Sequence, residues 1–168
     1  METKKVFISF GSNIGDKNDY IRRALLLVCS SSNTSLISCS SLMTTSPVGV
    51  NGQDDYINQV AIISTNIKPL QLIKEFKSIE AKLGRKQRAR WSEREIDIDI
   101  VIYEGVLMND KELVIPHKEL LNRLFLLKGC LDLEPEYVVE GLGITLKELY
   151  FNNIDRLKGQ SVVQALTS

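Results

Sequence analysis

The sequence predicts an α+β fold with a ferredoxin-like β-α-β-β-α-β core and a mainly antiparallel sheet. Two segments with helical periodicity, 16–31 and 68–84, alternate with β-rich segments, and this alternation gives the order of elements. The 168 residues, 43% of them apolar, fit a single domain, residues 1–168, with a substantial core. We expect three α/β/α layers, with both core helices on one face and extra C-terminal helices covering the sheet.

The first half of the core begins with the β-rich segment KVFISFGSN, which stops at Gly11. Residues 16–31 follow as a helix whose apolar residues share one face (Ile21, Ala24, Leu25 and Val28). Residues 35–43 form a weaker strand, and residues 55–65 form a stronger one that is rich in β-branched residues. A loop with glycine and proline connects these two strands.

The second half of the core contains the clearest helix, residues 68–84. Pro69 lies at its start and Gly84 at its end, as helix boundaries favour. Its apolar residues recur at helical spacing (Leu70, Ile73, Phe76, Ile79 and Leu83). The last core strand is REIDIDIVIY, residues 94–103, and shorter helices are expected from 117–132 and 145–151.

Composition excludes several classes of protein. The 21 basic residues balance the 21 acidic ones, so no overall charge favours a nucleic-acid or membrane partner. The three cysteines (Cys29, Cys39 and Cys130) form no C-x-x-C pair and are expected to be reduced, buried thiols. Because the sequence shows neither a signal-peptide core nor an apolar stretch of membrane length, we expect a cytoplasmic protein.

The last core strand carries two acidic residues on one face. Asp97 and Asp99 are two positions apart, so their carboxylates project to the same side, about 6.6 to 7 Å apart along the strand. The isoleucines between and around them project to the other side (Ile96, Ile98, Ile100 and Ile102). A strand with one solvated face explains this pattern too. The repulsion between two like charges nevertheless favours a cation or a basic group nearby.

A basic segment directly precedes the aspartates. From Lys82 to Arg94 there are six basic residues against one acid, Glu93. Such a run is usually a solvated loop, but arginines beside paired carboxylates suit a nucleoside triphosphate with Mg²⁺. The glycines of GSNIGDK do not have P-loop spacing. Nucleotide binding would therefore depend on side chains and metal.

Other polar and aromatic residues have two readings. Trp91 either anchors the basic segment in the core or stacks on a flat ligand. His117 is either an ordinary histidine or a donor to phosphate. The loop 44–55 is long enough to bind a ligand, and Tyr56 and Asn58 share one side of the following strand, where strand packing alone would also explain them.

Four segments in order, FISFGSNIGD, TTSPVG with DYINQV, LGRKQRARWSEREIDIDIVIY and VIPHKELLNRLFLL, resemble the 6-hydroxymethyl-7,8-dihydropterin pyrophosphokinase family of folate biosynthesis. The resemblance covers residues 5–136. It implies an ATP-dependent pyrophosphokinase that transfers diphosphate to the hydroxymethyl group of 6-hydroxymethyl-7,8-dihydropterin and releases AMP. The partners it implies are these two small molecules. We expect the protein to be a monomer, and a dimer stays open.

The resemblance also implies roles for individual residues. Asp97 and Asp99 would bind two Mg²⁺ ions and, with Arg85 and Arg94, form the catalytic set. The residues implied for ATP are Ile73, Lys77, Glu80, Arg85, Arg88, Arg94, Ile100, His117 and Arg123. The residues implied for the pterin are Thr45, Ser46, Val48, Tyr56, Asn58, Trp91, Asp97 and Phe125. Among these, Ile73 and Ile100 would lie near the adenine, Tyr56 and Phe125 would sandwich the pterin ring, and Trp91 would lie on a closing loop.

The chain departs from the family pattern in the basic segment. It has WSER, residues 91–94, where W-G-P-R is usual, and Gln87 where a second arginine is common. The resemblance therefore supports a phosphate-binding role for Arg94 more than for Arg88. Two alternatives remain open: an RNA-binding module with the same ferredoxin-like order, and a paired-aspartate, metal-dependent nucleotide transferase with another acceptor.

Overall fold

The computed structural model describes residues 2–47 and 51–165. The elements in chain order are β1 (Lys4–Ser12), α1 (Lys17–Val28), β2 (Thr34–Cys39), β3 (Met43–Thr45), β4 (Tyr56–Thr65), α2 (Pro69–Lys82), β5 (Asp97–Tyr103), β6 (Met108–Asn109), β7 (Val114–Ile115), α3 (Leu124–Leu133), α4 (Leu146–Leu157) and β8 (Val162–Gln164). The predicted β-α-β-β-α-β order is confirmed. Two strands, β2 and β3, take the place of the single weak strand expected at 35–43.

The main sheet has the strand order β5-β1-β4-β3-β8, and β2 pairs with β4 beside β3. Each of these pairings is antiparallel. The order places the two ends of the core, β1 and β5, side by side, as in a ferredoxin-like sheet. The small β6-β7 hairpin and the edge strand β8 were not predicted from the sequence.

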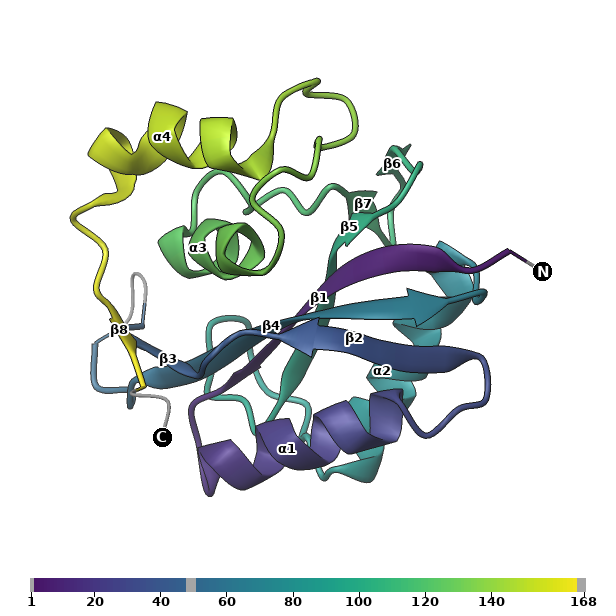
Figure 1. The fold of residues 1–168 in the computed structure, drawn as a ribbon. Helices are drawn as coiled ribbons and strands as arrows, with labels where there is room; N and C mark the ends of the chain where they lie inside the picture. Colours follow the sequence, from purple (N-terminus) through teal and green to yellow (C-terminus); the bar gives the residue numbers. More distant parts are fainter. Residues whose placement is uncertain (1, 48–50, 166–168) are drawn as a thin grey trace.

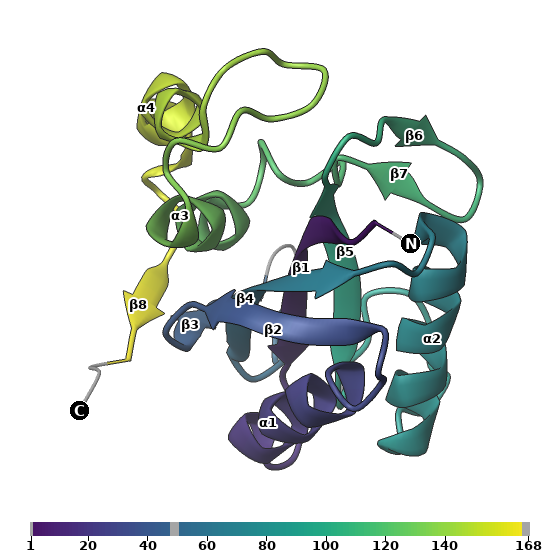
Figure 2. The same ribbon diagram turned by 45° about the vertical axis from the view of Figure 1, so that its right-hand side comes forward.

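The helices lie on both faces of the sheet, which confirms the layered fold. Figures 1 and 2 show α1 and α2 on one face and α3 on the other, with α4 on the outer side of α3. Helix α3 approaches β4 closely at Gly129, where an added Cβ would lie 2.4 Å from Cγ2 of Val60. Glycine therefore permits this contact. Helix α4 packs on α3 rather than directly on the strands.

Helix α2 shows one error in the predicted core face. Pro69 is its first residue and Gly84, with a φ of 89°, follows its end, as expected. Leu70, however, is 37% exposed, whereas Leu72 is 1% exposed. At 100° per residue Leu70 lies about 120° from Phe76 around the helix, outside the buried stripe. Leu72 takes its place in the core.

A β-bulge changes the alternation along β5. Ile8 of β1 pairs with Ile100 and Phe7 pairs with Ile102, so Val101 is an extra residue on β5. Ile96, Ile98 and Ile100 lie in the core cluster that includes α1 and α2, but Ile102 lies in the cluster with α3 and α4. The expectation that all four isoleucines share one face was therefore wrong for Ile102, because a bulge reverses the side to which later residues point.

The cysteines differ in exposure. Cys130 is buried, and burial raises the pKa of its thiol. Cys29 is partly exposed and Cys39 is exposed, which corrects the expectation that all three are buried. Cys39 ends β2, a strand whose apolar residues Leu36 and Ile37 are also exposed. Within the described ranges, no helix has the length and apolar character needed to cross a bilayer.

Candidate active site

A cleft of about 530 Å³ lies beside the two aspartates at the N-terminal end of β5. Its walls come from β1, β4, β5, helix α2, the segment 83–96, the segment that precedes α3 and the first turn of α3, with Pro47 and Gln53 from the loop before β4. The structure brings most of the expected residues into this one cleft: Tyr56, Asn58, Lys77, Arg85, Trp91, Arg94, Asp97, Asp99, His117, Arg123 and Phe125.

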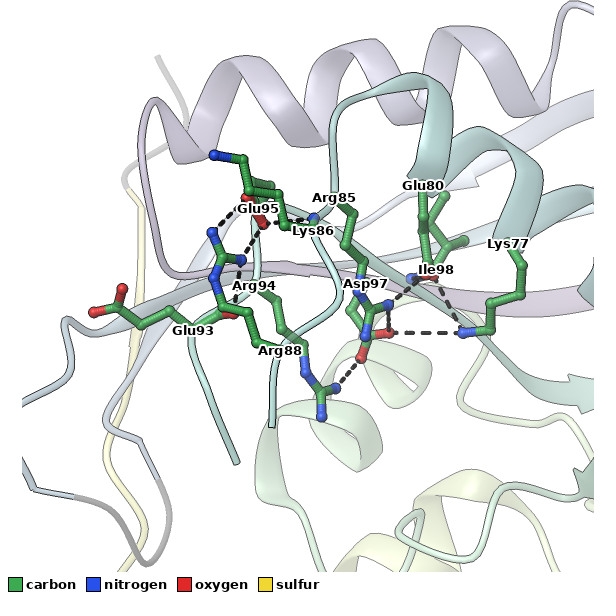
Figure 3. A network of polar contacts seen from close by, with 10 residues as sticks. All are labelled: Lys77, Glu80, Arg85, Lys86, Arg88, Glu93, Arg94, Glu95, Asp97 and Ile98. Carbon is green, nitrogen blue, oxygen red and sulfur yellow. Dashed lines mark hydrogen bonds and ion pairs between the residues drawn. The ribbon is translucent and has the colours of Figure 1, made fainter. Parts of the chain in front are cut away.

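Asp97 lies at the centre of a set of basic side chains (Figure 3). Its Oδ1 accepts a hydrogen bond from Arg85 Nη1 at 3.0 Å, and its Oδ2 accepts one from Arg94 Nη1 at 2.9 Å. Lys77 Nζ lies 3.9 Å from Oδ1. Burial acts to raise the pKa of Asp97, but the charges of Lys77, Arg94 and Arg85 outweigh it and lower the pKa. Asp97 is therefore ionised.

Asp99 has the opposite electrostatic environment. It pairs with Ser9 of β1 and faces the same cleft as Asp97. Burial raises the pKa of its carboxyl, and the negative charge of Asp97 raises it further. The two carboxylates thus repel each other, as expected from their spacing.

The pair fits a divalent cation. Carboxylate oxygens are the ligands that Mg²⁺ prefers, and a cation would offset the repulsion that raises the pKa of Asp99. Within residues 2–47 and 51–165, no group of three or more histidine, cysteine, aspartate or glutamate side chains is placed to hold a metal. Further ligands would therefore come from elsewhere, and phosphate oxygens are suitable.

Glu80 supports the basic residues from beneath. It is only 3% exposed, and its Oε2 accepts hydrogen bonds from the backbone N–H of Ile98 at 2.9 Å and from Lys77 Nζ at 3.3 Å. Its Oε1 accepts from Arg85. Glu80 thus holds Arg85 and Lys77 beside Asp97, although it does not itself line the cleft.

Arg88 is held outside the cleft lining by Glu95. Arg88 Nη1 and Nη2 donate to the two oxygens of Glu95 at 2.6 and 3.0 Å. Glu95 is 6% exposed, and the hydrogen bond from Arg88 lowers its pKa to about 2. Sequence reasoning missed Glu95, although it continues the two-residue spacing of Asp97 and Asp99 toward the basic segment.

In the wall of the cleft that β4 forms, Asn58 is fixed by Thr45, whose Oγ1 accepts a hydrogen bond from Asn58 Nδ2 at 2.7 Å. Both residues are buried. Gly11 leaves room for the amide, because a Cβ there would lie 2.9 Å from Asn58 Oδ1. Ser46 is exposed and its neighbour Pro47, which was not predicted, lines the cleft. Val48 lies outside the described residues.

The segment before α3 and the first turn of α3 contribute three further residues, His117, Arg123 and Phe125. The backbone N–H of Glu119 donates to His117 Nδ1 at 3.1 Å, and burial lowers the pKa of this histidine. The neutral ring therefore carries its hydrogen on Nε2, which is free to donate. The Arg123 guanidinium lies over the Phe125 ring, 5.2 Å from its centroid.

Ile73 and Ile100 lie in the core rather than in the cleft lining. They are 7% and 1% exposed and belong to the cluster beneath α1 and α2. Their expected position near the adenine stays a prediction. It requires either that their backbone atoms contact the adenine or that the site rearranges.

Trp91 is not a core anchor. It is 60% exposed, has a φ of 70°, and lies 5.2 Å from the guanidinium of Arg90. Its backbone carbonyl accepts from Gln53 Nε2 at 2.7 Å, and Asn13 Oδ1 accepts from the backbone N–H of Arg94 at 2.8 Å. Asn13 and Gln53, which are also hydrogen-bonded to each other, join three loops at the cleft. Sequence reasoning missed both, since isolated amides carry no periodic signal.

Comparisons with known proteins identify the family of this chain. Residues 7–135 match the model of the 7,8-dihydro-6-hydroxymethylpterin-pyrophosphokinase (HPPK) family. The 2-amino-4-hydroxy-6-hydroxymethyldihydropteridine pyrophosphokinase of Haemophilus influenzae is 35% identical over 133 residues, which cover 79% of this chain and 83% of that protein. The bifunctional protein FolKE of Lactococcus lactis is 38% identical over 127 residues, 76% of this chain but only 36% of its own length.

A solved structure supports the fold. The HPPK-DHPS of Plasmodium falciparum, crystallised with pteroate, aligns over 94% of this chain and 44% of its own with a TM-score of 0.73 and 17% identity. This chain thus spans less than half of that protein and about a third of FolKE. The match over residues 7–135 includes the aspartate strand, the basic segment and the residues that precede α3. The chain belongs to the 7,8-dihydro-6-hydroxymethylpterin-pyrophosphokinase family.

Proposed function

We propose that this chain transfers diphosphate from ATP to the hydroxymethyl group of 6-hydroxymethyl-7,8-dihydropterin, with the cleft beside Asp97 and Asp99 as its active site. The observation that carries the proposal is that the family match and the cleft coincide. The two aspartates share a cleft with Lys77, Arg85, Arg94, His117 and Arg123. Cationic and neutral donors around paired carboxylates suit a polyphosphate with its metal.

Asp97 and Asp99 would hold two Mg²⁺ ions together with ATP. When bound, Mg²⁺ neutralises phosphate charge and polarises the group that is transferred. Arg85 and Arg94 donate to Asp97. With the carboxylate holding a cation, these guanidinium groups would be available to pair with phosphate oxygens.

The reaction needs no nucleophilic side chain. The hydroxymethyl oxygen of the pterin forms a bond to the β-phosphorus, the bond from that phosphorus to the oxygen shared with the α-phosphate breaks, and AMP leaves. The hydroxyl proton is released to solvent. Arg85, Arg94 and Arg123 would stabilise negative charge on the phosphates, and His117 would donate its Nε2 hydrogen there.

The pterin would lie against the other wall of the cleft. Asn58, whose amide is fixed by Thr45, would read the edge of the ring, and Tyr56 and Phe125 would lie on its two faces. The backbone of Ser46 and Val48 would add contacts. Arg123 lies over the Phe125 ring, so it would move from the ring toward phosphate if a pterin took that place.

The product of the reaction tests this proposal. ATP labelled separately at the β- and γ-phosphates should deliver both labels to the pterin and leave AMP. Formation of ADP as the stoichiometric product would contradict diphosphate transfer. Replacing dihydropterin with other hydroxyl acceptors tests the alternative of another metal-dependent transferase. Family membership favours the enzyme over the RNA-binding alternative. Salt-sensitive binding of a single-stranded RNA of arbitrary sequence would favour that alternative again.

A further inference from the structure

The segment that follows α4 runs past α3 to the edge of the sheet, where β8 pairs with β3 (Figure 1). On the way its side chains contact the turn that begins α3. Two cleft residues, Arg123 and Phe125, lie at this point of the chain. The segment is beyond the matched residues 7–135, yet it adjoins the site.

Gln160 binds the backbone on both sides of Arg123. Its Oε1 accepts a hydrogen bond from the N–H of Leu124 at 2.9 Å, and its Nε2 donates to the carbonyl of Asn122 at 2.7 Å. Between these two groups Arg123 is extended, with φ −118° and ψ 113°. One carboxamide therefore fixes the backbone from which the Arg123 side chain reaches the cleft.

Helix α3 needs this contact because it has no cap of its own. Arg123 occupies the N-cap position and makes no side-chain cap hydrogen bond. A guanidinium only donates, so it cannot accept from the free N–H groups of the first turn. Gln160, which is 36 positions away, supplies an acceptor instead. The start of α3 thus depends on a contact that is not local.

Arg156 supports the same turn from the last turn of α4. It donates to the carbonyl of Leu121, and its Nη1 lies 3.4 Å from Asn122 Oδ1. The N–H of Gln160 donates to the carbonyl of Leu157 at 2.9 Å, which ties Gln160 to the end of the same helix. Helix α4 and the residues after it therefore hold 121–124 from one side.

We propose that Gln160 is a positioning residue for the diphosphate transfer, which acts by fixing the backbone of Arg123 so that the Arg123 guanidinium and the Phe125 ring face the substrates. The inference rests on the proposed function, which assigns Arg123 to ATP and Phe125 to the pterin. Gln160 does not line the cleft. Its effect comes from geometry, because a displacement of about 1 Å in a reacting constellation costs up to about 100-fold in rate.

The first experiment compares Gln160→Met with Gln164→Met. Gln160→Met keeps the length of the side chain and removes both hydrogen bonds. Gln164 is a matched control in the same segment, because its Nε2 donates at 2.9 Å to Asp132 near the opposite end of α3. We expect kcat to fall about tenfold and the pterin KM to rise in Gln160→Met, with both within about twofold of wild type in Gln164→Met. Equal kinetics in the two variants would overturn the positioning role.

A double-mutant cycle separates positioning from a loss of stability. If Gln160 acts through Arg123, Gln160→Met should cause little further loss in the Arg123→Ala background. If the losses in kcat of the two single variants multiply in the double variant, the two residues act independently and the proposal is overturned. Melting temperatures measured beside the kinetics show whether any variant loses activity by unfolding at the assay temperature.

Hydrogen exchange gives a readout that does not depend on activity. The amide of Leu124 should exchange faster in Gln160→Met than in wild type, and should be unchanged in Gln164→Met. Unchanged protection in Gln160→Met would show that the hydrogen bond does not hold this turn. If the wild-type protein forms no AMP, the proposed function fails and the positioning role with it. Faster exchange would then still record the contact itself.

Discussion

Arg94 donates to the carboxylate of Asp97 at 2.9 Å, whereas Arg88, from the same basic segment, donates to Glu95 at 2.6 Å. Arg94 and Asp97 line the cleft, but Arg88 does not. Two arginines that look equivalent in the sequence are therefore held by different carboxylates. Their partners determine which of them is placed to reach a phosphate.

Replacing each of these arginines with alanine should give different kinetics. Arg94→Ala should lower kcat by about 100-fold or more, because in the proposed reaction it removes a donor to the transferred group. Arg88→Ala should lower kcat by less than about tenfold, and lower the melting temperature, since it leaves Glu95 without its main partner. Steady-state kinetics at saturating ATP, with thermal melts, compare the two. Losses of similar size would mean that Arg88 moves into the cleft with ATP.

Asp99→Asn should abolish turnover without unfolding the protein. The amide keeps the shape of the side chain but gives up the charge that the metal would use, so we expect turnover to fall about 1,000-fold or more. Asp155→Asn is a control, because Asp155 has a side chain that is 96% exposed and pairs with Lys158 on the surface of α4. Activity near wild type in Asp99→Asn would contradict the metal assignment.

The same residue predicts a pH dependence of the metal-free protein. Burial and the charge of Asp97 raise the pKa of Asp99 from 3.8 to about 7. Between these values the folded state holds a proton that the unfolded chain has released, so this carboxyl makes the free energy of unfolding decrease as pH rises. Asp99→Asn removes that contribution. In a chelator, the variant should melt above wild type at pH 8 and show a smaller decrease from pH 5 to pH 8.

An identical slope in wild type and Asp99→Asn would show that Asp99 is not perturbed in the folded protein. Added Mg²⁺ should raise the melting temperature of wild type more than that of the variant, since a ligand that binds only the folded state stabilises it.

For Glu95 we expect the opposite pH dependence, in which the free energy of unfolding decreases as the pH falls. The hydrogen bond from Arg88 lowers the pKa of Glu95 from 4.5 to about 2. Its contribution to stability is therefore complete above pH 4.5 and is lost as pH falls toward 2. Glu95→Gln should reduce the melting temperature by a few degrees at pH 7 and weaken the dependence on pH between 2 and 4.5. Melting curves over pH 2 to 7 measure both effects.

The control for that experiment is Glu93→Gln, whose side chain points away from the Arg88–Glu95 pair in Figure 3. It should leave the acid dependence unchanged. A parallel response in both variants would indicate a general effect of charge rather than the specific pair.

Trp91 predicts a closing loop. It is 60% exposed and lines the cleft, so bound substrates would give its ring a surface to cover. We expect hydrogen exchange of residues 82–93 to slow when a non-hydrolysable ATP analogue and pterin are both bound. Trp91→Ala should then reduce the chemical step more than the affinity for ATP. Strong and equal protection with and without ligands would show a rigid segment and no lid.

The sequence by itself determined the features that depend on near neighbours. Two-residue spacing in β5 placed Asp97 and Asp99 on one face, and helical spacing with Pro69 and Gly84 gave α2 nearly to the residue. The joint motifs identified the family, and through it most of the residues that line the cleft. The faces of β5 and α2 are encoded within one turn of helix or a few residues of strand, so a periodic pattern is enough to reveal them. The cleft residues came instead from the resemblance to the family.

Only the tertiary structure decided how distant segments meet. The bulge at Val101 turned Ile102 to the other face, and the pairing with Glu95 took Arg88 away from the cleft lining. Gln160 caps a helix 36 positions before it. Each of these depends on the register between β1 and β5, on the path of a loop, or on the packing of α4 against α3. No local pattern specifies such contacts, because their partners are brought together only when the whole sheet and its helices are assembled.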